Sequence, residues 1–280
     1  MTVSFGERLE RVFNERGRLC VGIDPHAWLL RDWGLADTAA GAREFGLRVL
    51  DAVDGNAGIV KPQVAFFERF GSAGYAALEE ILAAARSRGI LVIADAKRGD
   101  VGSSVEAYGQ AWLTPGSPLE ADALTVSAYQ GVGSLAAPST LAESTGKGLF
   151  VLAATSNPEG MALQQARMSA GTTVARSIVD EVNAWNAEHA TGALGSIGVV
   201  IGATLRLAEF DLELAPQPAP PVLAPGFGHQ GAEAESMQKI YGALSSGVIV
   251  SESRSVLGAG PDGIRRAVTT RAEIVRQASA

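Results

Sequence analysis

Eight short runs rich in Val, Ile and Leu are the feature of this sequence that most constrains its fold, because longer amphipathic stretches separate them. Such runs are typical of parallel strands that are buried on both faces and covered by helices. They occupy residues 19–24, 58–62, 90–96, 123–127, 149–155, 197–203, 222–226 and 248–251. Eight such strands are the number that closes an α/β barrel, so the sequence predicts a (β/α)8 TIM barrel.

The stretches between these runs predict the helices of the barrel. Helical periodicity is found at residues 39–53, 74–88, 105–112, 172–189, 234–244 and 262–276. A leading helix at 5–16 is expected to cap the bottom of the barrel, and the chain length of 280 residues suits a single barrel domain over 1–280. The biased segment APQPAPP at 215–221 is interpreted as a stiff surface loop rather than a linker, because a strand-like run follows it directly.

Composition and charge argue against several classes of function. A net charge of −7 disfavours a nucleic-acid-binding surface, and no run reaches the roughly 18 apolar residues of a membrane-spanning helix. The 3 histidines are far apart in the sequence, so we expect no metal site. The single cysteine, Cys20, has no partner for an internal disulfide, and the N-terminal residues lack the pattern of a secretory signal. We therefore expect a cytoplasmic protein.

Ionisable residues stand at the ends of the first three predicted strands. The first ends at Asp24 (VGID), the second ends at Lys61 (IVKP), and the third continues into Asp95, Lys97 and Asp100 (IADAKRGD). Barrel enzymes place their reacting groups at these C-terminal strand ends. Asp95 and Lys97 are two residues apart, so in an extended chain their side chains share one face. A structural ion pair is the alternative for any one pair, but three consecutive charged strand ends favour a functional site.

Asp95, Lys97 and Asp100 in IADAKRGDVGSS also form the D-x-K-x-x-D signature of the orotidine monophosphate decarboxylase superfamily, which this sequence resembles. The segments VGIDP, IVKPQVAFFE and LAATSNPEG are similar to the longer bacterial branch of the decarboxylase, and the resemblance runs from the first strand to the eighth. It implies decarboxylation of orotidine 5'-monophosphate to uridine 5'-monophosphate, the last step of de novo pyrimidine nucleotide synthesis, without a cofactor.

The resemblance also implies a role for each of these residues. Asp24 and Lys61 would bind the ribose hydroxyls and hold the charge network. Asp95 would face the substrate carboxylate and Lys97 would donate the proton, while Asp100 would come from the neighbouring subunit of a homodimer with shared active sites. These residue types suit the chemistry, because loss of CO2 leaves a carbanion without an electron sink, and a fixed ammonium can both stabilise and protonate it.

A glycine-rich turn follows the seventh predicted strand. In APGFGHQG, Gly226, Gly228 and Gly231 have the G-x-G-x-x-G spacing of a dinucleotide-binding fold, but only one strand and one helix remain after it. An NAD oxidoreductase is therefore disfavoured. In a barrel, this turn and the segment after the eighth strand are a frequent phosphate site, so we expect Gly226, Gly228 and Arg254 to bind a substrate phosphate. By the resemblance, Gln230 is a further phosphate contact.

Two serines complete the expected site. By the resemblance, Ser156 in TSNPEG reads the pyrimidine edge, although the local sequence favours a turn residue almost as strongly. Short members of the family carry Thr where this chain has Ser104, whose hydroxyl would reach the ribose across the dimer. They also carry Gly where this chain has Ser253, directly before the predicted phosphate-binding arginine.

Two other functions are compatible with these motifs. Another sugar-phosphate barrel of the superfamily, such as a keto-gulonate phosphate decarboxylase, shares D-x-K-x-x-D but uses magnesium, and TSNPEG argues against it. A non-catalytic phosphometabolite-binding barrel is the second, although a binding protein has little reason to keep Lys97 among several acidic groups.

Overall fold

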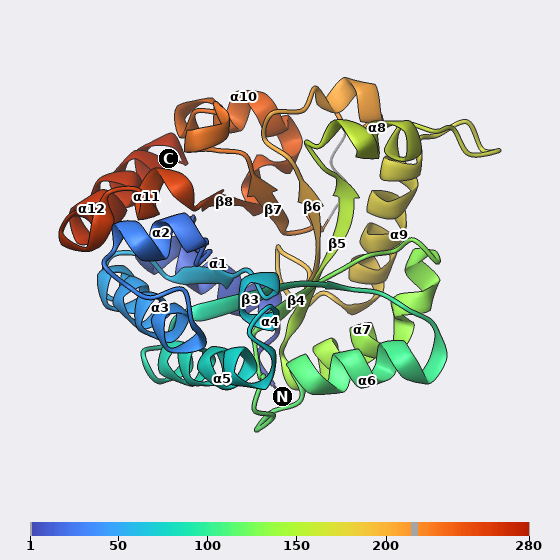
Figure 1. The fold of residues 1–280 in the computed structure, drawn as a ribbon. Coiled ribbons are helices and arrows are strands. Elements are labelled where there is room, and N and C mark those ends of the chain that lie inside the picture. Colours follow the sequence, from blue (N-terminus) through green and yellow to red (C-terminus); the bar gives the residue numbers. More distant parts are fainter. Residues whose placement is uncertain (1, 214–217, 280) are drawn as a thin grey trace.

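The eight predicted strands form one closed parallel barrel in the computed structural model of the chain, which describes residues 2–213 and 218–279 (Figure 1). Neighbouring strands follow chain order, and β8 closes onto β1. The strands are β1 (Leu19–Ile23), β2 (Ile59–Pro62), β3 (Leu91–Arg98), β4 (Ala123–Val126), β5 (Gly148–Ala154), β6 (Ile197–Ile201), β7 (Val222–Pro225) and β8 (Val248–Glu252). The predicted TIM barrel is confirmed, because every strand lies where a Val, Ile and Leu run predicts it.

Helices cover the outside of this barrel (Figure 1). The longer helices are α1 (Phe5–Arg16), α3 (Ala39–Val53), α5 (Gly71–Ser87), α6 (Gly102–Leu113), α7 (Ala136–Thr145), α9 (Val174–His189) and α12 (Gly260–Ala278). The shorter ones are α2 (Ala27–Asp32), α4 (Ala65–Glu68), α8 (Pro158–Gln164), α10 (Met237–Tyr241) and α11 (Arg254–Leu257), with 3-10 segments η1 (Val132–Leu135), η2 (Leu207–Phe210), η3 (Gly228–Gln230), η4 (Ala234–Ser236) and η5 (Gly242–Gly247). None of the helices in residues 2–213 and 218–279 combines the length and the hydrophobicity of a membrane-spanning segment.

Helix α1 packs against the end of the barrel at which the strands begin. Its first turn is fixed by a capping box, in which the Ser4 hydroxyl accepts the Glu7 N–H and the Glu7 carboxylate accepts the Ser4 N–H. The ring of Phe5 then meets the ring of Phe150 edge to face, with centroids 5.9 Å apart. Both rings are fully buried, so α1 covers the apolar end of the barrel interior and leaves the opposite end free for polar groups.

The barrel interior changes from apolar to polar along the strands, because alternate side chains of each strand point inward. One buried cluster contains the inward-facing apolar residues Cys20, Ile59, Leu91, Ile93, Ala123, Phe150, Val200, Leu223 and Ile249. Two residues further along their strands, the same inward rows carry Lys61, Asp95, Thr125 and Ser251. The polar layer therefore lies at the C-terminal ends of the strands, on top of an apolar filling.

Two expectations from the sequence are wrong. Residues 234–244 form η4, α10 and part of η5 rather than one helix, because Gly242 takes φ 51° and ψ −122° and ends α10. Of the segment 215–221, residues 215–217 lie outside the described residues, but the rest is not a surface loop. Ala219 is 3% exposed and bridges to Leu194, and the prolines that follow are also buried.

Candidate active site

A cavity of about 270 Å³ opens at the C-terminal ends of the barrel strands. Apolar side chains from three neighbouring strands, Leu152, Val200 and Leu223, line one part of it. Seven of the residues predicted for the site line the cavity as well: Asp24, Lys61, Asp95, Lys97, Gly226, Gln230 and Arg254. The fold thus brings the charged strand ends and the glycine-rich turn to a single cavity.

Asp95 is the centre of the charge network in this cavity. Lys61 Nζ donates a hydrogen bond to Asp95 Oδ2 at 3.1 Å, and Lys97 Nζ donates to Asp95 Oδ1 at 2.6 Å. The side chains of Lys61 and Asp95 are 9% and 10% exposed, whereas that of Lys97 is 44% exposed. The carboxylate is therefore held between two ammonium groups, and the Lys97 ammonium is the more accessible of the two.

The opposite charges outweigh burial in setting the pKa values of this network. Burial alone would raise the pKa of Asp95, but the charges of Lys61 and Lys97 and their hydrogen bonds hold it well below its usual range. Burial alone would lower the pKa of Lys61, but the charges of Asp95 and Asp24 raise it above its usual value. Both groups are therefore ionised at neutral pH and supply fixed charges to the cavity.

Asp24 meets the eighth strand across the point where the barrel closes. β1 pairs with β8, and just beyond the paired residues the Ser253 hydroxyl donates a hydrogen bond to Asp24 Oδ2. Gly22 leaves room for this contact, since a Cβ there would lie 2.8 Å from the Ser253 Cβ. Asp24 Oδ1 is buried and has no hydrogen-bond partner among the described residues. Because Asp24 lines the cavity, this oxygen can accept a hydrogen bond from a ligand.

The glycine-rich turn and Arg254 line the same cavity. Gly226 has φ 116°, a left-handed conformation that favours glycine, and it lines the cavity together with Phe227, His229 and Gln230. Arg254 lies two residues after the end of β8 and is the first residue of α11. Arginine binds anions through two parallel N–H groups, so a guanidinium that lines the same cavity as a glycine turn suits a phosphate group.

Four predicted residues do not line the cavity of the single chain. Asp100 accepts a hydrogen bond at 2.8 Å from the backbone N–H of the next residue, and Ser104 is exposed on the first turn of α6. Ser156 is exposed directly after Thr155, which does line the cavity. Gly228, with φ 68°, lies in the turn between two lining segments. The roles of these four residues as ligand contacts stay predictions.

The structure adds polar residues that the sequence analysis did not assign to the site: Gln63, Thr125, Ser253 and His229. Gln63 Oε1 accepts a hydrogen bond from Lys97 Nζ at 3.4 Å, and Thr125 Oγ1 donates to Asp95 Oδ1 at 2.9 Å. The alternation of inward- and outward-facing side chains along the strands could have predicted three of these residues. Gln63, Thr125 and Ser253 each lie two residues beyond an inward-facing position.

A family model described as "Orotidine 5'-phosphate decarboxylase / HUMPS family" matches residues 17–266. The chain belongs to the orotidine 5'-phosphate decarboxylase / HUMPS family. It is 51% identical over 259 residues to the orotidine 5'-phosphate decarboxylase of Salinispora tropica, an alignment that covers 92% of this chain and 91% of that one. It is 49% identical over 263 residues to the orotidine 5'-phosphate decarboxylase of Corynebacterium efficiens, with 94% and 92% covered.

Solved structures in the orotidine 5'-phosphate decarboxylase / HUMPS family have the same fold. A crystal structure from Streptomyces avermitilis aligns with a TM-score of 0.93 at 47% identity, covering 100% of this chain and 97% of that chain. The OMP decarboxylase of Leishmania donovani aligns with a TM-score of 0.78 at 28% identity, with 99% of both chains covered. The barrel and its order of strands are therefore shared over essentially the whole chain.

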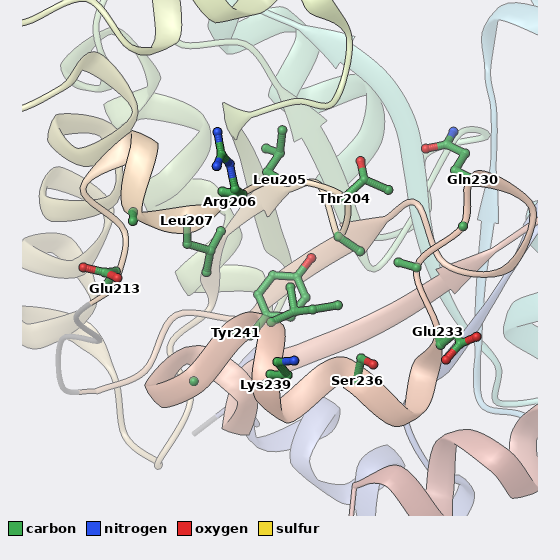
Figure 2. Close-up of a pocket in the computed structure, with 16 residues that line it drawn as sticks. Thr204, Leu205, Arg206, Leu207, Glu213, Gln230, Glu233, Ser236, Lys239 and Tyr241 are labelled. Atoms are coloured by element: carbon green, nitrogen blue, oxygen red, sulfur yellow. The ribbon is translucent and has the colours of Figure 1, made fainter.

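A second, larger hollow of about 850 Å³ lies next to the cavity at the strand ends. It is found between the segment after β6 and helix α10 (Figure 2). Gln230 borders both spaces. The ionisable residues of the larger hollow are mixed in sign, with Arg206 and Lys239 against Glu213 and Glu233. Its size is greater, but it contains none of the charged strand ends, so we assign the active site to the smaller cavity.

The geometry predicts that removal of the Asp95 carboxylate destabilises the fold. In Asp95→Ala, the buried ammonium of Lys61 loses its partner, and we expect the free energy of unfolding to fall by about 3–5 kcal/mol near neutral pH. Denaturant unfolding measures this difference. The matched control is Glu44→Ala, which breaks the exposed Glu44–Arg48 ion pair at 2.8 Å and should cost less than about 1 kcal/mol.

The same variant pair tests the direction of the Asp95 pKa. Folding lowers the pKa of Asp95. The stabilisation of the folded state by this carboxylate is therefore fully present above the pKa of Asp95 in the unfolded chain, and it is lost only as the pH falls through the lower pKa of the folded state. The difference between wild type and Asp95→Ala should therefore be constant between about pH 5 and 7 and shrink in stronger acid. A difference that already disappears at about pH 5 would contradict this assignment.

Proposed function

We propose that this chain decarboxylates orotidine 5'-monophosphate to uridine 5'-monophosphate and CO2, the last step of de novo pyrimidine nucleotide synthesis. The observation that carries the proposal is the hydrogen-bonded row Lys61–Asp95–Lys97 in a cavity that is also lined by a glycine turn and Arg254. The two curated relatives, at about half identity over most of both chains, are orotidine 5'-phosphate decarboxylases, which supports the same reaction here.

The proposed mechanism needs only groups of the protein. When the bond between C6 and the carboxylate breaks, its electron pair stays on C6 and CO2 leaves. The Lys97 ammonium lies where this charge develops, stabilises it, and then gives a proton to C6. Asp95 faces the substrate carboxylate and fixes Lys97, which suits its position between two ammonium groups. Since Lys97 supplies both the charge and the proton, the mechanism uses no cofactor.

The remaining residues bind the nucleotide in this proposal. Asp24 accepts a hydrogen bond from a ribose hydroxyl through its free Oδ1, and Lys61 lies beside the same sugar. The phosphate is held by Arg254, by Gln230 and by the turn that contains Gly226 and Gly228. Ser156 contacts the pyrimidine edge after a movement of the segment between β5 and α8, because it is exposed outside the cavity in this structure.

We also propose that one cytoplasmic barrel domain pairs with a second copy. Asp100 and Ser104 do not line the cavity of their own chain, which supports the proposal that they contact substrate in the cavity of the partner. Val101 and Tyr108 are apolar yet 55% and 38% exposed, and Tyr108 is four residues after Ser104 on the same face of α6. Burial of this face between two copies would favour the dimer.

Replacement of the proposed proton donor is the direct test of the reaction. Lys97→Ala should lower kcat by at least about 10⁴-fold, because both the charge opposite the carbanion and the proton source are lost. The assay follows the absorbance of orotidine 5'-monophosphate with a chelator present, and wild type should be fully active under that condition. Near-normal turnover of a folded Lys97→Ala variant would contradict the mechanism.

Replacement of Arg254 tests the phosphate site. Arg254→Ala should raise KM for the nucleotide about 10- to 100-fold, the cost of losing charged hydrogen bonds, and should hardly change the reaction of the phosphate-free nucleoside. The control is Arg206→Ala, since Arg206 borders the neighbouring hollow and is 85% exposed (Figure 2). An equal loss with nucleotide and nucleoside would mean that Arg254 has a structural role.

Mixing two inactive variants tests the shared site. Lys97→Ala and Asp100→Ala homodimers should both be inactive, but in a mixed dimer one site carries both changes and the other carries neither. Random reassociation makes about half of the dimers mixed, so roughly a quarter of all sites should recover full activity. Native mass spectrometry measures the exchange. If subunits exchange and no activity returns, Asp100 serves its own chain.

A further inference from the structure

The ladder between β3 and β4 is interrupted beside the catalytic lysine. Ala94 pairs with Leu124, and the next pair is Arg98 with Val126, so β3 advances by four residues while β4 advances by two. The extra residues of β3 include Lys97, whose φ of 50° is a left-handed conformation that non-glycine residues rarely adopt. The backbone of Lys97 therefore needs a contact that replaces the lost ladder.

Thr125 supplies that contact from the middle of the interrupted region. It lies between Leu124 and Val126, is fully buried, and shares the inward-facing row of β4 with Ala123. Its hydroxyl oxygen accepts a hydrogen bond from the Lys97 backbone N–H at 3.0 Å. The Lys97 N–H, which the ladder no longer pairs, is thus satisfied by a side chain.

The same hydroxyl is also linked to the side-chain ammonium of Lys97, through the carboxylate of Asp95. Thr125 Oγ1 donates to Asp95 Oδ1 at 2.9 Å, and this oxygen also accepts the hydrogen bond from Lys97 Nζ at 2.6 Å. Thr125 therefore fixes the backbone of Lys97 directly and its ammonium through one shared carboxylate oxygen. A hydroxyl is required, because the group must accept one hydrogen bond and donate another.

We infer that Thr125 is a positioning residue for the decarboxylation, which holds Lys97 in its left-handed turn so that the ammonium stands at the reacting carbon. The inference rests on the proposed role of Lys97 as the proton donor. Thr125 does not touch the substrate in this scheme; it acts on Lys97 and Asp95. It should therefore affect the chemical step far more than the binding of nucleotide.

Thr125→Val is the decisive variant, because it keeps the shape of the side chain and removes both hydrogen bonds. We expect kcat to fall about 100-fold, the usual effect of a small displacement of a reacting group, while KM and the Kd of uridine 5'-monophosphate change less than about threefold. Thr125→Ser keeps the hydroxyl and should restore kcat to within about fivefold of wild type. Turnover assays and calorimetric titration with uridine 5'-monophosphate give these values.

A matched control is available at Thr173, which is also buried and hydrogen-bonded to backbone but is not among the residues that line the cavity. Its hydroxyl donates to Phe210 O at 2.7 Å and accepts the Arg176 N–H at 3.1 Å. Thr173→Val also removes one donated and one accepted hydrogen bond of a buried threonine hydroxyl, and it should lower the free energy of unfolding without lowering kcat. If Thr125→Val does not fold, as judged by circular dichroism, Thr125→Ala removes the same hydrogen bonds without adding a methyl group in place of the hydroxyl.

Three results would overturn the inference: a kcat within about twofold of wild type in the folded variant, a parallel loss of nucleotide affinity, or no recovery with Thr125→Ser. These outcomes are distinguishable from failure of the proposed function. If Lys97→Ala alone keeps near-normal turnover, the role of Lys97 is wrong. If Lys97→Ala is inactive but Thr125→Val is normal, only the positioning role of Thr125 is wrong.

Discussion

A carboxylate inside an apolar barrel is the constraint on which the rest of the site depends. Asp95 is 9% exposed, and a lone charge in such a place would cost far more than the fold can offset. The two hydrogen-bonded ammonium groups of Lys61 and Lys97 make the charge tolerable. The three residues are therefore interdependent, and the pairing that stabilises the carboxylate also holds Lys97 at the mouth of the cavity.

The barrel makes this arrangement possible by separating two tasks along each strand. The inward positions near the strand starts are filled by residues such as Ile59 and Ile93, and α1 covers that end. The inward positions two residues later are Lys61 and Asp95. Packing thus provides the stability in the lower layers, and the upper layer can hold charges and strained backbone that would otherwise weaken the fold.

The sequence predicted the strands well because burial on both faces leaves a plain apolar run in each. It predicted Asp24, Lys61, Asp95 and Lys97 in one place because parallel strands all end at the same side of the barrel. It did not predict Thr125, since a single threonine in an apolar strand has ordinary strand propensity, and its importance arises from a change of register with β3. The positions of exposed residues such as Asp100 relative to a second copy depend on contacts between chains, which the pattern of one chain does not contain.

The contact between Asp24 and Ser253 joins two residues that are 229 positions apart. Because β1 forms its last lateral contact with β8, the barrel stays an open sheet until the eighth strand has been made. During synthesis from the N-terminus, Asp24 leaves the ribosome early, and its partner Ser253 follows only after nearly the whole chain has been made. The cavity is therefore among the last features to be completed, and a nascent or C-terminally truncated chain would present unpaired strand edges rather than a partly working site.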